Sequence, residues 1–277
     1  MSIAITGATG QLGQLAIAAL KERGVSPIAL ARSPEKLAAS GVEARAFDYE
    51  TADPKALEGV ETLVLISSSE VGRRFPQHQN VIAAAKAAGV KRILYTSLLK
   101  GAASPMKLAA EHIETEAALQ ASGLAVTLLR NGWYAENLTG ALGAAIEHGA
   151  IIGASGEGRY SAAARKDYAE AIAVVATGEG HEGKVYELAG DDSFTGADLA
   201  AEVAAQSGKP VAWAPLSEAD YAKALEGFGL PAAFAAILAD SDAKTAEGAL
   251  EDNSKTLSRL IGRPTTPLRD VVAAALA

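Results

Sequence analysis

The chain has 277 residues, of which 49% are hydrophobic and 21% charged, a composition typical of a soluble globular protein with a substantial core. Its formal net charge of −8 argues against binding to nucleic acid, which needs clustered lysine and arginine. The lack of cysteine excludes disulfides, thiolate catalysis and cysteine-ligated metals. The sequence shows no basic leader and no apolar run of about 18 residues, so we expect a cytoplasmic protein without membrane contact.

The first thirteen residues carry the most informative pattern of the chain. A short apolar run, Ile3–Ile5, predicts a buried strand, and helical spacing of apolar residues from Leu12 onward predicts a helix. Gly7, Gly10 and Gly13 lie between them, spaced as glycines that let a backbone approach a dinucleotide pyrophosphate at a helix N-terminus. The alternative is a glycine-rich turn that binds nothing, but the flanking strand and helix favour the dinucleotide site.

Strands and helices then alternate as far as residue 129. Further buried strands are predicted at residues 27–31, 42–47, 62–66, 92–96 and 125–129. Helices are predicted between them at residues 34–39, from Asp53 as N-cap, at about 75–88 and at about 105–121. This alternation predicts an α/β fold of the Rossmann type, with a doubly wound parallel sheet and right-handed crossovers.

The pattern changes from Trp133 onward. Helices are predicted at about 136–148, 167–177, 195–207 and 217–239, with short strands at 184–189 and 210–213. We therefore expect an NADP-binding Rossmann domain at residues 1–132 and a smaller, mostly helical substrate and lid domain at residues 133–277. One of the later strands could return to the main sheet.

Polar residues follow each predicted strand of the first domain. In open α/β sheets ligands bind beyond the carboxyl ends of the strands, so these residues mark a candidate ligand edge. After the glycine loop they are Arg32, Asp48, Ser67, Ser68, Ser69, Thr96, Ser97 and the segment 130–134.

Arg32 indicates which cofactor is used. An NAD-specific site has an acidic residue after the second strand, whereas an arginine there suits the 2′-phosphate of NADPH. The alternative for Arg32 is a solvated surface arginine. Asp48 could accept a hydrogen bond from the adenine amino group or cap the next turn, and Ser67–Ser69 could line the ribose and nicotinamide or cap the next helix.

The catalytic residues are less clear from the sequence. The four histidines show no metal-ligand spacing, so we expect no metal, and no Gly-x-Ser-x-Gly motif points to a serine hydrolase. The helix after the fifth strand lacks a Tyr-x-x-x-Lys pair, leaving His112 and Lys107 as candidate proton donors. A partly exposed helical histidine such as His112 is more often structural than catalytic.

Residues 130–137 are the better candidates for substrate contact. Trp133 and Tyr134 offer flat apolar faces to a planar ligand, and Asn131 and Asn137 offer amide donors. The alternative is that the two aromatic residues belong to an ordinary core. Arg165, just before a predicted helix, could reach over the site as part of a lid.

Ten sequence blocks together resemble one known family. The chain resembles the NmrA-like branch of atypical short-chain dehydrogenase/reductases, and within it the flavin-free type 2 NADPH:quinone oxidoreductases and their triphenylmethane reductase relatives. The blocks cover nearly the whole chain: Ile5–Gly13, Leu65–Gly72, Ala83–Val90, Tyr95–Leu99, Glu111–Glu116, Leu128–Tyr134, Gly180–Gly190, Leu216–Asp220, Leu238–Asp242 and Ser254–Ser258.

The resemblance implies a cofactor, a substrate class and site residues. It implies NADPH without flavin or metal as the cofactor and a planar quinone-like acceptor, with Trp133, Tyr134, Glu136 and Asn137 beside the nicotinamide and the acceptor. A homo-oligomer is left open. The residues that it implies for NADPH are Gly7, Ala8, Thr9, Gly10, Gln11, Leu12, Arg32, Ser67, Ser68, Ser69, Arg73 and Gln77; Gly13, Asp48, Thr96 and Ser97 are added by position.

Three functions remain open at this point. Without the Tyr-Lys pair, reduction of a ketone to an alkoxide lacks its proton donor, whereas a quinone gives a delocalised anion that needs less help. We therefore expect direct hydride transfer from NADPH to a quinone. The alternatives are an NADP(H)-sensing regulator without turnover and a reductase of another planar electrophile, such as a dye or an enone.

Overall fold

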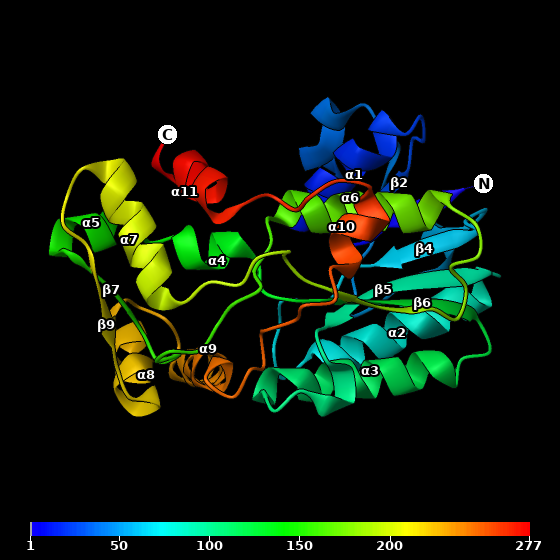
Figure 1. Cartoon of the computed structure of the whole chain (residues 1–277). Coiled ribbons are helices and arrows are strands. Elements are labelled where there is room, and N and C mark those ends of the chain that lie inside the picture. The colour runs from blue at the N-terminus through cyan, green and yellow to red at the C-terminus, as the bar shows by residue number, and fades with distance from the viewer. Residues whose placement is uncertain (1) are drawn as a thin grey trace. The chain divides into compact units, whose positions relative to one another are not determined.

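A computed structural model describes residues 2–277 and shows a seven-stranded sheet in the order β3-β2-β1-β4-β5-β6-β8 (Figure 1). Strands β1 to β6 pair in parallel, so the predicted doubly wound parallel sheet is confirmed. The chain moves outward from β1 to β3 and then resumes on the other side of β1 with β4. The strands are β1 (Ile3–Ile5), β2 (Ile28–Ala31), β3 (Ala44–Ala46), β4 (Thr62–Leu65), β5 (Arg92–Leu98), β6 (Ala125–Asn131) and β8 (Val185–Leu188).

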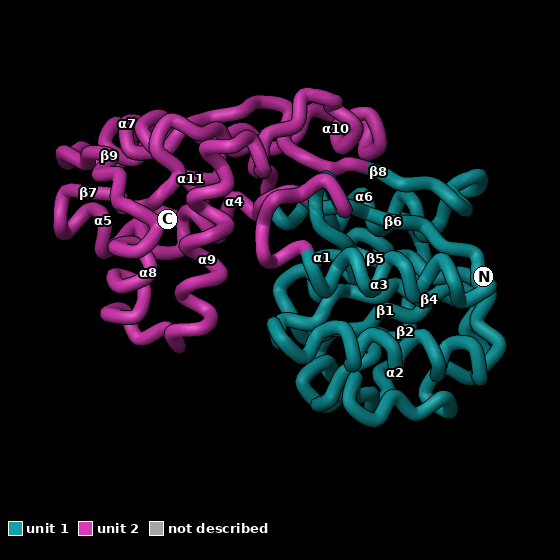
Figure 2. The backbone as a smooth tube through the Cα atoms, turned by 90° about the horizontal axis from the view of Figure 1, so that it is seen from below, with its two compact units in different colours: residues 1–101, 110–131, 165–186 teal, residues 102–109, 132–164, 187–277 magenta. Residues whose placement is uncertain are grey.

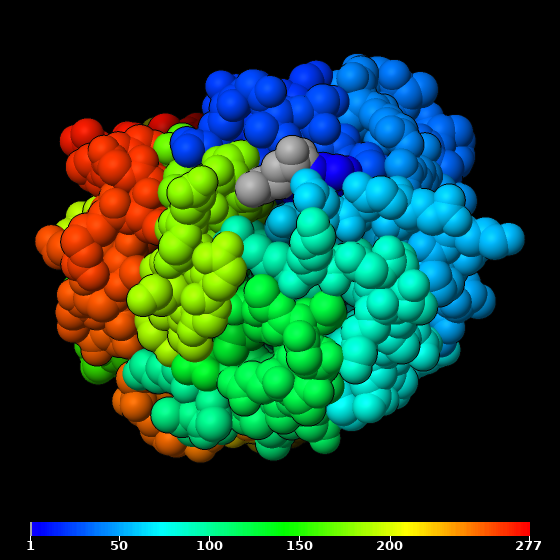
Figure 3. Space-filling model, turned by 90° about the vertical axis from the view of Figure 1, so that its right-hand side faces the viewer, coloured from blue at the N-terminus to red at the C-terminus, as the bar shows by residue number. Residues whose placement is uncertain are grey.

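Helices cover both faces of this sheet. On one face α1 packs beside α6, and on the other α2 packs beside α3, so β1, β4 and β5 are buried throughout (Figure 1). Figure 3 shows the molecule in space-filling form from the right-hand side of Figure 1, where segments coloured blue, cyan and green lie side by side at the surface. The helices are α1 (Gln11–Glu22), α2 (Arg74–Ala87), α3 (Ala110–Gln120) and α6 (Arg165–Thr177), with 3₁₀ turns at Pro34–Ser40, Pro54–Leu57, Gly101–Ala103 and Lys107–Ala109.

The chain forms two compact units, coloured separately in Figure 2. Unit 1 holds residues 1–101, 110–131 and 165–186, and unit 2 holds residues 102–109, 132–164 and 187–277. The chain thus leaves unit 1 for residues 102–109 and again after residue 131, and residues 165–186, with α6, return to it. Unit 2 contains α4 (Ala135–Thr139), α5 (Leu142–His148), β7 (Ala150–Gly153), α7 (Gly196–Ser207), β9 (Ala212–Pro215), α8 (Glu218–Gly227), α9 (Ala232–Thr245), α10 (Thr256–Ile261) and α11 (Leu268–Leu276).

Three predicted helices were too long. The one expected at about 136–148 is two helices, α4 and α5, separated at residues 140–141. The helix expected at 105–121 begins only at Ala110, because residues 102–109 belong to unit 2, where the backbone N–H of Lys107 donates to Asp240 over 2.8 Å. The helix expected at 217–239 is two helices, interrupted where Gly229 takes a φ of +92° and Pro231 lacks an N–H. Strand β7 and the helices α10 and α11 had no prediction.

Candidate nucleotide site and its surroundings

The glycine loop joins β1 to α1 in a conformation that needs glycine. Gly7 has a φ of +60°, and a Cβ atom added to Gly13 would lie 2.3 Å from the carbonyl oxygen of Gly7. Gly10 is the N-cap of α1, so no side chain caps the first N–H groups of this helix. The loop is therefore closed onto the helix start, as a pyrophosphate-binding turn requires.

Tyr49 joins the ends of β1 and β4 at the point where the strand order reverses. Its hydroxyl lies 2.6 Å from the Thr6 hydroxyl and donates to the carbonyl oxygen of Ile66 over 2.7 Å. The backbone N–H of Ile66 in turn donates to Thr6 Oγ1 over 3.0 Å. Burial raises the pKa of Tyr49, so the hydroxyl keeps its proton. Sequence reasoning missed this contact, because its partners are far apart in the chain.

Arg32 immediately follows β2. Its side chain is 73% exposed, and Nη1 lies 3.7 Å from Glu70 Oε1. Within residues 2–277 the guanidinium makes no hydrogen bond, so all its N–H donors are available to a ligand. This arrangement fits a bidentate contact with a phosphate.

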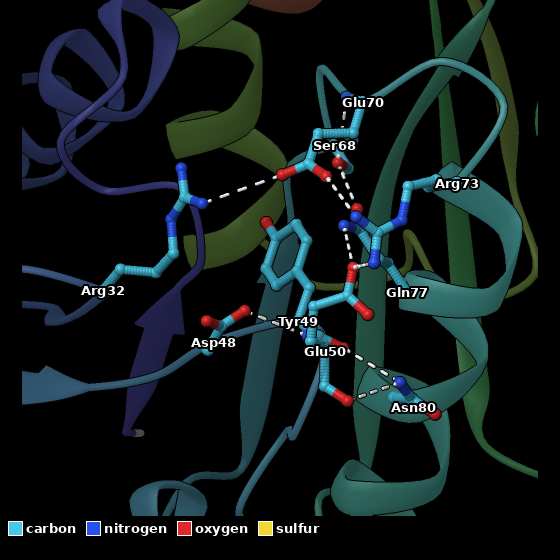
Figure 4. A network of polar contacts seen from close by, with 9 residues as sticks. All are labelled: Arg32, Asp48, Tyr49, Glu50, Ser68, Glu70, Arg73, Gln77 and Asn80. Carbon is cyan, nitrogen blue, oxygen red and sulfur yellow. Dashed lines mark hydrogen bonds and ion pairs between the residues drawn. The ribbon is translucent and has the colours of Figure 1, made fainter.

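Asp48 forms a local turn. Its Oδ1 accepts a hydrogen bond from the backbone N–H of Glu50 over 3.0 Å. The structure thus shows the turn-capping alternative for Asp48. The hydrogen bond from the adenine amino group to Asp48 stays a prediction. Asp48 and Glu50 both lie in the network of Figure 4.

The three serines begin the loop between β4 and α2, and backbone and side-chain bonds fix them. The N–H of Ser67 donates to Thr96 Oγ1 over 2.8 Å, and Ser68 Oγ donates to Gln77 Oε1 over 2.5 Å. The alternative that these serines cap the next helix is wrong, because α2 begins at Arg74 with Arg73 as its N-cap and no side-chain cap. Their contact with the ribose and nicotinamide stays a prediction.

Arg73 and Gln77 meet at one carboxylate. Arg73 Nη2 lies 2.8 Å from Glu50 Oε1, and Gln77 Nε2 donates to the same oxygen over 2.7 Å (Figure 4). Gln77 is buried, whereas the Arg73 side chain is two-thirds exposed. Gln77 therefore holds the serine loop through its bond to Ser68, and the exposed Arg73 side chain remains accessible to a ligand.

Thr96 and Ser97 lie within strand β5. The sequence had suggested that they lie beyond the end of this strand. Strand β5 continues to Leu98 because it pairs with β6 residue by residue, from Arg92 opposite Ala125 to Leu98 opposite Asn131. Ser97 Oγ donates to Glu116 Oε1 over 2.5 Å. Both hydroxyl side chains are buried. Thr96 bonds to the loop after β4, and Ser97 bonds to α3.

His112 is buried, which corrects the expectation of a partly exposed histidine. Its Nε2 lies 3.2 Å from Arg74 Nη1 and its Nδ1 lies 2.7 Å from the Tyr95 hydroxyl. Burial, together with the charge of Arg74 and the neighbouring His78, lowers the pKa of His112 well below its usual value. The side chain is thus neutral at neutral pH.

Lys107 belongs to unit 2, where it forms ion pairs. Its Nζ lies 3.1 Å from Asp240 Oδ1 and 3.6 Å from Glu218 Oε1. The bond to Asp240 raises the pKa of Lys107, so this ammonium group retains its proton at neutral pH. The catalytic roles of Lys107 and His112 remain predictions that this geometry does not favour.

The expected acceptor residues are divided between the two units. Asn131 ends β6 in unit 1, and its carbonyl oxygen accepts from the N–H of Leu99 over 2.9 Å. Arg165 begins α6, also in unit 1. Trp133, Tyr134, Glu136 and Asn137 lie in unit 2 at the start of α4. Their contact with an acceptor stays a prediction.

Across residues 2–277 no three histidine, aspartate or glutamate side chains lie close enough to hold a metal ion. None of the helices in this range is both long and apolar enough to cross a membrane.

Residues 7–179 match a protein family described as NAD(P)H-binding. Quinone oxidoreductase 2 of Escherichia coli is 56% identical over 98% of this chain and 97% of its own length, and an NAD(P)H azoreductase of Xenophilus azovorans is 29% identical over 95% and 93%. The crystal structure of the NADPH-dependent quinone oxidoreductase from Escherichia coli with NADPH superposes with a TM-score of 0.95, at 55% identity over 99% of this chain and 100% of that one. Triphenylmethane reductase from Citrobacter sp. with NADP(H) gives a TM-score of 0.91, at 38% identity over 99% and 100%.

Proposed function

Because this chain belongs to the NAD(P)H-binding family, we propose that it is an NADPH-dependent quinone reductase that works without flavin. The observation that carries the proposal is the guanidinium of Arg32, which stands at the end of β2 with all its hydrogen-bond donors unused. The 56% identity with a quinone oxidoreductase over nearly the whole length supports the substrate class.

The residues of unit 1 fit the cofactor. The turn at Gly7–Gly13 leaves no space for a side chain on Gly13, and the uncapped start of α1 would hold the pyrophosphate. Arg32 would bind the 2′-phosphate, with Arg73 and Asp48 at the same edge. When bound, NADPH supplies the hydride. Ser67–Ser69 are fixed firmly enough to orient its ribose and nicotinamide.

The chemistry needs no strong acid from the protein. Hydride addition to a quinone gives a hydroquinone anion whose charge is delocalised over the ring, and a proton from water completes the hydroquinone. His112 is neutral and buried, and Lys107 has a raised pKa, so neither is suited to donate a proton at neutral pH. The protein's part is therefore to orient the two reactants.

The acceptor site is the remaining part of the proposal. Trp133 and Tyr134 of unit 2 would stack on the quinone ring, with Glu136 and Asn137 of the same unit at its polar edge. The roles of Asn131 at the acceptor and of Arg165 as a lid residue stay predictions from the sequence. In this scheme unit 1 binds NADPH, and residues 133–137 of unit 2 contribute to the acceptor side. We also propose a cytoplasmic location, from the sequence.

Turnover without added flavin tests the proposal. The purified protein would be mixed with NADPH and a panel of benzoquinones, and the nicotinamide absorbance band followed over time. We expect NADPH oxidation with at least one quinone, and no flavin absorbance in the protein. A triphenylmethane dye and an enone in the same panel distinguish a reductase of other planar electrophiles. Tight NADPH binding without turnover on any acceptor would contradict the proposal and favour a sensor.

A further inference from the structure

Four charged side chains of alternating sign in unit 1 are linked one to the next by ion pairs (Figure 4). Glu70 lies between two arginines: its Oε1 is 3.7 Å from Arg32 Nη1 and its Oε2 is 3.8 Å from Arg73 Nη1. Arg73 in turn contacts Glu50 over 2.8 Å. We call Arg32, Glu70, Arg73 and Glu50 the charged row.

The loop that carries Glu70 is fixed in place. The backbone N–H of Glu70 donates to Ser68 Oγ over 3.2 Å, and Ser68 is itself bonded to Gln77. Glu111, on α3, accepts from the N–H groups of Gly72 over 2.8 Å and Phe75 over 3.1 Å. The Glu70 carboxylate is therefore presented to Arg32 by a loop that is bound on both sides of it.

The two arginines of the row differ in how strongly they are held. Arg73 has a close partner in Glu50, whose position Gln77 also fixes. Among residues 2–277 Arg32 has only Glu70 as an ion-pair partner, at a distance too long for a hydrogen bond. A phosphate can therefore replace Glu70 at Arg32 while Arg73 keeps Glu50.

We propose that Glu70 is a specificity-determining residue that competes with the cofactor's 2′-phosphate for Arg32. The proposal rests on the function proposed above, in which Arg32 binds that phosphate. A 2′-phosphate that binds Arg32 takes the place of the Glu70 carboxylate beside the guanidinium, and the phosphate and the carboxylate then lie near each other with the same sign of charge. NADH carries no 2′-phosphate and meets neither cost, so Glu70 narrows the difference in affinity between the two cofactors.

The variant Glu70→Gln tests this competition without turnover. Calorimetry at low ionic strength would measure the dissociation constants of 2′,5′-ADP and 5′-AMP, which differ by the 2′-phosphate. We expect Glu70→Gln to bind 2′,5′-ADP up to about five-fold more tightly, the upper end of what an exposed ion pair contributes, with 5′-AMP altered less than about two-fold. In the Arg32→Ala background the same substitution should gain less, because no pair remains to be broken.

Glu43→Gln is the matched control. Glu43 is an exposed glutamate that pairs with Arg45 over 2.7 Å at the start of β3, the opposite edge of the sheet. This variant loses the same charge and should leave both constants unchanged. A thermal melt of each variant confirms that it is folded.

Two other results would overturn the proposal in distinguishable ways. If the wild type prefers 2′,5′-ADP and Glu70→Gln leaves that preference within about two-fold, Glu70 does not compete and the Arg32 site stands. If the wild type binds both nucleotides equally, Arg32 holds no 2′-phosphate, and the proposed NADPH preference fails together with the role of Glu70.

Discussion

Arg74 and His112 form a buried contact in which only one assignment of protons is allowed. Arg74 Nη1 lies 3.2 Å from His112 Nε2, and a guanidinium can only donate, so Nε2 must accept. The proton of the neutral ring is then on Nδ1, which donates to the Tyr95 hydroxyl over 2.7 Å. A second proton on this ring would place an N–H against the Arg74 donor.

His78 is fixed in the same way. Its Nε2 accepts from the backbone N–H of Ser68 over 2.9 Å, and its Nδ1 lies 3.0 Å from Thr115 Oγ1. Thr115 donates its own hydroxyl proton to the Glu111 carbonyl oxygen over 2.7 Å. Burial lowers the pKa of His78 to about 3. Two neutral, buried histidines thus support the serine loop: His78 bonds to Ser68 directly, and His112 contacts Arg74, which bonds to Ser68.

These two histidines predict that the protein loses stability in mild acid. In the unfolded chain a histidine gains a proton as the pH falls below about 6.5, whereas the folded rings stay neutral until much lower pH. The free energy of unfolding should be constant above about pH 7 and fall by about 2 kcal/mol for each histidine by pH 5. Urea unfolding between pH 7.5 and pH 5 measures this slope.

The variant His78→Gln is the control for this slope. Glutamine keeps an acceptor for Ser68 and a donor for Thr115 but does not titrate. Its unfolding free energy should fall about half as steeply with pH as that of the wild type. An equally steep fall would show that other groups, such as carboxylates, cause the acid sensitivity.

Removing the two candidate proton donors should affect catalysis little. A general acid contributes about 10²- to 10⁴-fold, so its loss would be obvious in kcat. Because His112 is neutral and Lys107 has a raised pKa, we expect His112→Gln and Lys107→Met to keep kcat within about three-fold of the wild type. Quinone reduction between pH 6 and pH 8 is the measurement. A hundred-fold loss in a fully folded variant would assign that residue to proton transfer.

Short sequence patterns predicted the elements whose formation depends on neighbouring residues in the chain. The order of strands and helices as far as β6, the glycine turn and the N-cap at Asp53 follow from short sequence windows. Asp53 accepts from the N–H of Lys55 over 3.0 Å. The sheet was predicted correctly because its strands are apolar runs that are buried on both faces, as in β4 and β5.

Contacts between distant segments could not be predicted from such windows. The hydroxyl of Tyr49 joins Thr6 to Ile66, and nothing in the residues beside Tyr49 indicates either partner. His112 resembles a surface residue in the helical pattern, and it is buried only because α3 packs against Arg74 and Tyr95. Likewise, the length of β5 is set by its pairing with β6.

Gly13→Ala should abolish nucleotide binding. The added methyl group would lie 2.3 Å from the Gly7 carbonyl oxygen and 2.9 Å from the Ala8 Cα, so the turn or the start of α1 must shift. Calorimetry with NADP⁺ should show at least a hundred-fold weaker binding, by the loss of most phosphate contacts.

Gly143→Ala gives a matched comparison for that variant. Gly143 lies in α5, and a Cβ atom there would meet nothing within 4 Å. The same chemical change should leave NADP⁺ binding unaltered and stabilise the helix slightly, by about 0.5–1 kcal/mol. Normal binding in Gly13→Ala would show that the glycine turn does not contact the cofactor.

Arg32→Ala should change the choice of cofactor more than the chemistry. A charge-assisted contact with the 2′-phosphate contributes about 1.5–3 kcal/mol, so KM for NADPH should rise by about ten- to a hundred-fold. KM for NADH and the kcat with either cofactor should stay within about two-fold, because Arg32 lies at the end of β2 and has no part in hydride transfer. Arg32→Lys should recover part of the loss, since an ammonium keeps the charge but not the bidentate geometry. Equal effects on NADPH and NADH would mean that Arg32 supports the fold of the loop and does not bind the phosphate.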